Sequence, residues 1–241
     1  MNYLLIAFLL NLSATAATRP STAIYSGDVA QDKYNEAIEA EQSGKINRAL
    51  ELYTAAISLD PEFEYAYVNR GSIYSSLGKN KEAMADLDKA IKLDPKDAMA
   101  YNNRSNLLNH LGRWKEAIQG YEKAVALNPK ILPAYMGAGR SNEMLKNFPE
   151  AISWLSRLLK LNPKCFECLR IRALLYAKNL QPKQALEDIK AAKKLKLNLE
   201  QLATIKELEE SFVSLQEQLS DPHISAEQRE QIRRELQGAE G

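Results

Sequence analysis

Two cysteines are the side chains of this sequence with the clearest capacity for covalent chemistry. Cys165 and Cys168 are the only cysteines and form a C-x-x-C motif. A thiol at the start of a helix ionises more readily, and two thiols at this spacing are typical of dithiol redox sites. The sequence therefore leaves three hypotheses open for this pair: a structural disulfide, two free thiols, or a redox-active dithiol.

The remaining ionisable residues point to no catalytic centre. His110 and His223 are the only histidines and lie far apart in the sequence, so we expect neither a metal site nor a catalytic pair. Asp86 and Asp88 are expected to be ordinary charges on a helix surface. Because no nucleophile and base are paired and no phosphate-binding loop occurs, the sequence predicts no enzyme activity and no cofactor.

A repeat positions most of these residues. Alanine and proline recur at a spacing of 34 residues, the first at Ala49, Ala83, Ala117, Ala151 and Ala185 and the second at Pro61, Pro95, Pro129 and Pro163. Between them, Gly44, Gly78 and Gly112 stand where a chain must turn from one helix into the next. Since proline ends a helix, each repeat is expected to be helix, turn, helix, turn. The sequence therefore predicts an all-α fold.

The period also sets the expected boundaries. We expect a signal peptide and a linker, then four regular repeats and a fifth degenerate one, and finally a capping helix with a polar tail. These segments are residues 1–17, 18–29, 30–63, 64–97, 98–131, 132–165, 166–197 and 198–241. An amphipathic last helix would cover the apolar face that a terminal repeat exposes.

The repeats resemble those of the tetratricopeptide repeat family. The segments 66–71 and 81–95 fit the family pattern well, whereas Lys146 and Leu180 replace the turn glycine in repeats four and five. The resemblance implies a right-handed α-solenoid of about five repeats with a C-terminal capping helix. It also implies that the first helices line a concave groove, which positions 2, 5, 6, 9 and 13 of each repeat face.

The groove positions contain candidate binding residues. Position 6 is Asn35, Asn69 and Asn103 in the first three repeats. An asparagine amide offers both a donor and an acceptor, so it can pair in two places with the backbone of an extended peptide. This run is similar to the asparagine ladder of O-linked N-acetylglucosamine transferase; a structural role for these asparagines is the alternative. The other groove candidates are Tyr65, Met99, Asn102, Asn106, Arg140 and Arg170.

The N-terminus and the charge pattern bear on location and partners. Residues 4–12 are mostly apolar, and Ala14–Ala17 follow with small side chains, which favours a cleaved export signal and a periplasmic or secreted protein. An uncleaved N-terminal anchor is the alternative. The run is shorter than the roughly 20 residues of a membrane-spanning helix, so we expect no span in the mature chain. Scattered lysines and a net charge of +1 argue against nucleic-acid binding.

These features predict a protein-interaction scaffold or assembly factor that binds an extended polypeptide in its groove. Two alternatives stay open. The first is a thiol-disulfide protein that uses Cys165 and Cys168. The second is a structural protein that self-associates weakly through its C-terminal helix, whose apolar residues Leu199, Leu202, Ile205, Leu208, Phe212, Leu215 and Leu219 share one face.

Overall fold

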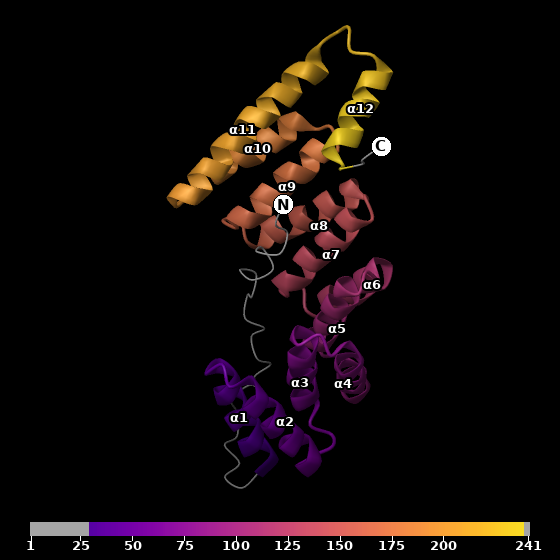
Figure 1. The fold of residues 1–241 in the computed structure, drawn as a ribbon, viewed down its shortest axis with the longest axis vertical. Coiled ribbons are helices and arrows are strands. Elements are labelled where there is room, and N and C mark those ends of the chain that lie inside the picture. The colour runs from indigo at the N-terminus through magenta and orange to yellow at the C-terminus, as the bar shows by residue number, and fades with distance from the viewer. Residues whose placement is uncertain (1–28, 239–241) are drawn as a thin grey trace. The chain divides into compact units, whose positions relative to one another are not determined.

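The computed structural model describes residues 29–238, and every regular element in that range is a helix (Figure 1). The expected all-α class is confirmed. The predicted signal peptide and nearly all of the predicted linker lie outside the described residues. The helices are α1 (Val29–Gln42), α2 (Ile46–Leu59), α3 (Glu64–Ser76), α4 (Asn80–Leu93), α5 (Ala98–His110), α6 (Trp114–Leu127), α7 (Leu132–Met144), α8 (Phe148–Leu161), α9 (Phe166–Lys178), α10 (Pro182–Ala192), α11 (Leu199–Ser220) and α12 (Ala226–Leu236).

The turn between the two helices of a repeat has the same backbone conformation with and without glycine. Gly44 and Gly78 both have φ of 71°, in the left-handed region that glycine enters without steric cost. Lys146 and Leu180 occupy the corresponding turns with φ of 58° and 55°. A side chain there costs about 1–2 kcal/mol. Packing of the flanking helices therefore imposes this turn even where the sequence does not favour it.

The chain divides into two compact units, which are described separately. Unit 1 contains α1 to α5, and unit 2 contains most of α6 together with α7 to α12. In unit 1, α1 packs against α2 and α3 against α4, while α2 contacts α3 and α4 contacts α5. Small residues let these helices approach closely, because Ala37, Ala49 and Ala83 are fully buried.

Unit 2 continues the same pairing. α7 packs against α8, α8 against α9, and α9 against α10. Gly137 on α7 makes room for an aromatic ring, since a Cβ atom at this position would lie 2.3 Å from Cζ of Tyr121. The glycine is therefore required by its neighbour rather than by its own backbone angle.

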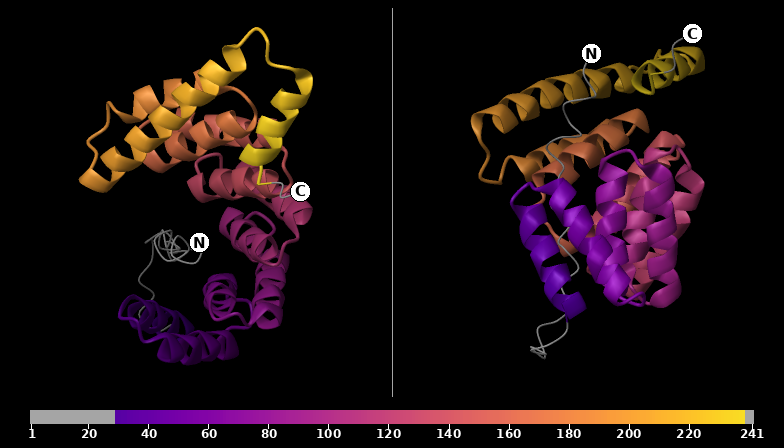
Figure 2. Two further views of the ribbon diagram at one scale, coloured as in Figure 1. Left: turned by 45° about the horizontal axis from the view of Figure 1, so that its top comes forward. Right: turned by 60° about the horizontal axis from the view of Figure 1, so that its bottom comes forward.

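The last two helices, α11 and α12, are joined by a loop of residues 221–225 (Figure 2). α11 packs on α10 and buries Ile205, Phe212 and Leu215, as expected of a capping helix. The apolar face is not covered at its start, because Leu199 is 87% and Leu202 48% exposed. Both leucines lie in the first turns of α11, before its first buried residue.

Both C-terminal helices begin with a capping box. Asn198 accepts a hydrogen bond from the backbone N–H of Gln201, and Ser225 accepts one from that of Gln228. Each glutamine side chain in turn accepts from the backbone N–H of its partner, which satisfies two helix-end donors at once. The Ser225 box begins the short helix α12.

Two arginine–aspartate ion pairs link neighbouring helices. Arg70 on α3 donates two hydrogen bonds of 2.8 Å to the carboxylate of Asp86 on α4, and a third of 3.1 Å to Thr54 on α2. Arg172 on α9 likewise donates two hydrogen bonds to the carboxylate of Asp188 on α10. The prediction that Asp86 is a surface charge is wrong: it is only 6% exposed, because a bidentate arginine partner offsets its burial.

Candidate functional site

The first helix of the second repeat, α3, has two faces of different character. One face carries Tyr67, Arg70 and Tyr74, and it is turned toward the second helices, since Arg70 bonds to α2 and α4. The opposite face carries Tyr65 and Ser72, which lie seven residues, or two turns, apart. This second face is half-exposed, and Tyr65 on it packs against the core cluster of α1, α2 and α3.

The same face recurs on α1 and α5. We call it the inner face of unit 1 and define it as positions 2, 6, 9 and 13 of the first three repeats. Position 5, also expected in the groove, is buried in all three repeats. The inner face comprises Gln31, Asn35, Ile38 and Gln42 on α1, Tyr65, Asn69, Ser72 and Ser76 on α3, and Met99, Asn103, Asn106 and His110 on α5.

Asn69 lies at the centre of a buried hydrogen-bond network. Its side-chain NH2 donates to the hydroxyl of Tyr34 at 3.1 Å and to that of Tyr53 at 3.3 Å. The hydroxyl of Tyr53 in turn donates to the carboxylate of Glu41 at 2.9 Å. Asn69 itself is 6% exposed. The network therefore joins α1, α2 and α3.

This network fixes the orientation of the Asn69 amide. Tyr53 gives its only proton to Glu41, so its oxygen must accept from Asn69. Burial raises the pKa of both Tyr34 and Tyr53 above the ordinary value of 10.0, so both hydroxyls carry their protons at neutral pH. Because both amide hydrogens are taken, only the carbonyl oxygen of Asn69 remains for a ligand. The sequence predicted that each ladder asparagine could both donate to and accept from a peptide backbone. At Asn69 only acceptance is possible, because its NH2 group already donates to Tyr34 and Tyr53.

The other two ladder asparagines have different surroundings. Asn35 is exposed and accepts a hydrogen bond of 3.0 Å from Gln31. Asn103 is 9% exposed and accepts one of 3.2 Å from its neighbour Asn102. Asn102 is 2% exposed, and its own carbonyl oxygen has no hydrogen-bond partner among residues 29–238. The three asparagines thus share a register but not an environment, and peptide contact by them stays a prediction.

The remaining predicted groove residues fall in both units. In unit 1, Tyr65 and Met99 are half-buried and Asn106 is exposed. In unit 2, Arg140 is exposed, whereas Arg170 is engaged by Glu167, whose hydrogen bonds raise the pKa of the arginine. Arg140 is therefore the more accessible cation of the two.

The two cysteines meet at the start of α9. The structure contains a Cys165–Cys168 disulfide, with Cα atoms 5.3 Å apart. Cys165 is the N-cap residue of α9, and its sulfur accepts a hydrogen bond of 3.2 Å from the backbone N–H of Cys168. Cys168 is buried where the second, third and fourth repeats have alanine, and Cys165 is half-buried. A structural and a redox role both remain hypotheses.

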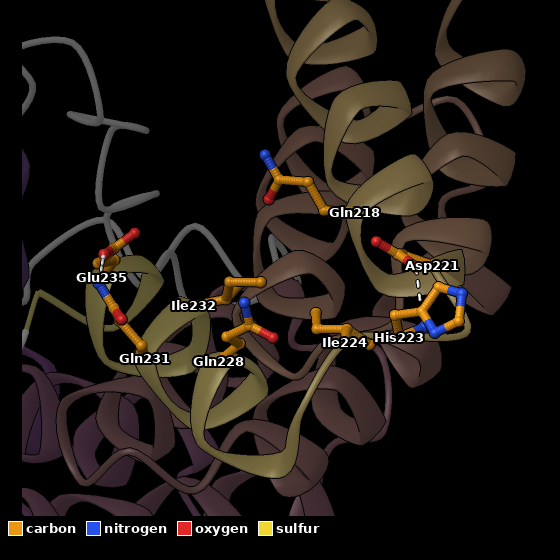
Figure 3. A pocket seen from close by; sticks show the side chains of 8 residues that line it. All are labelled: Gln218, Asp221, His223, Ile224, Gln228, Gln231, Ile232 and Glu235. Carbon is orange, nitrogen blue, oxygen red and sulfur yellow. Dashed lines mark hydrogen bonds between the residues drawn. The ribbon is translucent and has the colours of Figure 1, made fainter.

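A pocket that the sequence did not predict lies between α11 and α12 (Figure 3). Its volume is about 440 Å³. Its wall is mostly polar, with two isoleucines, and comprises Gln218, Asp221, His223, Ile224, Gln228, Gln231, Ile232 and Glu235. No residue spacing in this segment signals a pocket, because the cavity arises from the loop that turns α12 back.

Two further properties concern residues 29–238. No group of three or more His, Cys, Asp or Glu side chains in this range could hold a metal ion. No helix within it is long and apolar enough to cross a membrane.

Comparison with known families defines the class of protein as a helical-repeat solenoid. Three models described as tetratricopeptide repeat match residues 64–97, 87–119 and 111–164, and one described as TPR repeat matches residues 42–78. The chain belongs to the tetratricopeptide repeat family. The predicted likeness to the asparagine ladder of O-linked N-acetylglucosamine transferase stays a prediction.

Solved structures of other repeat proteins share the fold. A structure of pilF from Pseudomonas aeruginosa matches with a TM-score of 0.66 and 19% identity, covering 88% of this chain and 98% of that one. MamA from Desulfovibrio magneticus RS-1 matches at 0.64 and 20%, covering 70% and 96%. YrrB, described as a TPR protein with an unusual peptide-binding site, matches at 0.60 and 22%, covering 76% and 94%.

Proposed function

We propose that the chain is a non-catalytic protein-interaction scaffold and that the inner face of unit 1 binds an extended polypeptide. The observation that carries this proposal is the recurrence of one half-exposed face on α1, α3 and α5. Packed helices lie about 8–10 Å apart, and an extended chain rises about 3.3 Å per residue. About three residues of a ligand would therefore pass each repeat.

The chemistry of the inner face suits a polypeptide backbone. Asn35 is exposed, and Asn69 keeps its carbonyl oxygen as an acceptor for a backbone N–H. Tyr65 and Met99 add apolar surface that adapts to different side chains. YrrB, which shares the fold, is itself described as having a peptide-binding site, and this supports the same class of ligand here.

Affinity capture tests this proposal. The full-length tagged chain is compared with the double variant Asn35→Ala/Asn106→Ala, which alters two exposed inner residues, and with Asn47→Ala on α2 as a matched control. We expect the double variant to lose captured proteins that the control retains, as read by mass spectrometry. A synthetic peptide from a lost protein should then bind the parent more tightly than the double variant.

An identical set of proteins captured by all three chains would contradict the proposal. Binding would then lie outside the inner face. Self-association through α11, whose Leu199 and Leu202 are exposed, would become the leading hypothesis. Sedimentation at two protein concentrations would measure it.

We also propose that the protein is exported. The support is the apolar run followed by small residues at the N-terminus, together with the Cys165–Cys168 disulfide, because disulfides persist in oxidising compartments. N-terminal sequencing of the purified protein tests this. A new N-terminus near residue 18 is expected, and a chain that still begins with Met1 and remains in the cytoplasm would contradict it.

A further inference from the structure

The inner face of unit 1 contains no Asp, Glu, Lys or Arg at any of its positions. Its accessible groups are amides, hydroxyls and apolar side chains, such as those of Asn35, Ser72 and Ile38, together with the imidazole of His110. The corresponding positions in unit 2 include Arg140 and Glu167, so neutrality is a property of unit 1 and not of the repeat pattern.

The rest of unit 1 shows that this neutrality is local. The exposed side of α4, a second helix, carries Lys81, Glu82, Asp88 and Lys92. Unit 1 is thus neutral on the inner face of its first helices and charged on the exposed side of this second helix.

Several acidic residues flank the inner face, and the carboxylates of Glu41 and Asp97 are engaged by the protein. Glu41 accepts the hydroxyl proton of Tyr53 at 2.9 Å. Asp97 accepts from the backbone N–H groups of Met99 and Ala100, at 2.8 and 3.0 Å, and so caps the start of α5. These two acids have their hydrogen bonds within unit 1.

The absence of charge on the inner face determines which ligand side chains can bind there. A charged ligand side chain laid on this face would lose water without gaining a counter-charge, which is strongly unfavourable. A ligand amide or hydroxyl group would exchange its water for the asparagine, glutamine and serine groups of the face. Discrimination of this kind arises from rejecting the wrong ligand as much as from attracting the right one.

We infer that unit 1 binds an extended segment without charged side chains, rich in amide, hydroxyl and apolar groups, and that it rejects charged segments. This inference rests on the proposed function and adds the chemical class of the partner. A segment of about nine residues would pass all three repeats at about three residues per repeat.

The test uses an array of random 12-residue peptides probed with the full-length chain at about pH 8, where histidine side chains are neutral. We expect bound peptides to contain Asp, Glu, Lys and Arg at least about threefold less often than the array as a whole. Binding should also be unchanged between about 50 and 500 mM salt, because no ion pair contributes.

A matched pair of variants completes the test. Ser72→Lys adds a charge to the inner face, and Ser58→Lys adds the same charge to the exposed side of α2. The first should shift the bound peptides toward Asp and Glu by about tenfold, and the second should leave the selection unchanged. Bound peptides as charged as the array would overturn the inference alone. Failure to bind any peptide would overturn the proposed function, and the inference with it.

Discussion

Asn69 illustrates how one residue can have both a structural and a binding role. Its NH2 group holds two tyrosine hydroxyls, and its carbonyl oxygen is left over. The sequence predicted the position of this asparagine but not its partners. Position 24 of a repeat is Tyr53 in the first repeat and Leu87 in the second. Asn69 therefore meets a tyrosine hydroxyl from the repeat before it, whereas Asn103 follows a repeat with leucine at that position.

The first prediction concerns this network. Asn69→Ala should lower the free energy of unfolding by about 1–3 kcal/mol, because it leaves the buried hydroxyls of Tyr34 and Tyr53 without their donor. Asn35→Ala, at an exposed position of the same register, should change it by less than about 0.5 kcal/mol. Urea denaturation measures both. Equal stability of the two variants would mean that the network contributes nothing.

The second prediction concerns Glu41 and pH. Burial raises the pKa of this carboxyl above its ordinary value of 4.5, while the hydrogen bond from Tyr53 lowers it. The folded chain therefore holds this proton more tightly than the unfolded chain. The contribution of Glu41 to stability is full below about pH 4 and is lost as the pH rises through the raised pKa.

Glu41→Gln keeps an oxygen that accepts from Tyr53 but carries no charge. Its free energy of unfolding should exceed that of the parent at pH 7, and the difference should shrink toward zero near pH 4. Chemical denaturation at a series of pH values measures this. Parallel stability curves for parent and variant would refute it.

At the scale of helices, the sequence predicted much of the arrangement. The 34-residue period, the turn glycines and the prolines located the paired helices correctly. What it could not predict depends on contacts between distant residues. The burial of Asp86 requires Arg70 on another helix, and the exposure of Leu199 depends on how far α11 extends along its neighbour.

The sequence assigned residues to the candidate site but did not predict the packing around each of them. The phases of the first helices assigned Tyr65 and Met99 to the groove, and both are half-buried. They could not show that Asn102 is almost fully buried, because a repeat position does not determine the packing around it. The pocket between α11 and α12 follows no repeat and had no sequence signal.

The third prediction concerns packing between helices. Alanine normally stabilises a helix relative to glycine by about 0.5–1 kcal/mol. Gly137→Ala should instead destabilise unit 2 by about 1–3 kcal/mol, because the new methyl group would overlap the ring of Tyr121.

The double variant Gly137→Ala/Tyr121→Leu provides the control. Position 24 is already leucine in the second repeat, at Leu87, so leucine is compatible with the repeat packing. Adding Gly137→Ala to Tyr121→Leu should cost less than adding it to the parent, as measured by a double-mutant cycle of urea midpoints. A Gly137→Ala variant more stable than the parent would show that the ring moves aside.

At the scale of the whole molecule, a repeat array offers a surface rather than a cleft. Each repeat contacts its sequence neighbours, so binding groups recur at the repeat spacing and a long ligand can meet several of them. In unit 1 this produces a neutral inner face along α1, α3 and α5 and a charged exposed side on α4. The account therefore makes the inner face the place where a partner polypeptide lies.

Site-specific photo-crosslinking tests that claim most directly. A photoreactive phenylalanine is placed at Ser72 on the inner face or at Ser58 on the exposed side of α2, in the full-length chain exposed to its native cellular extract. The account predicts crosslinks to a partner polypeptide from position 72 and none to that partner from position 58. Crosslinks to the same partner from position 58 alone would place binding on the opposite side of the repeats and contradict the account.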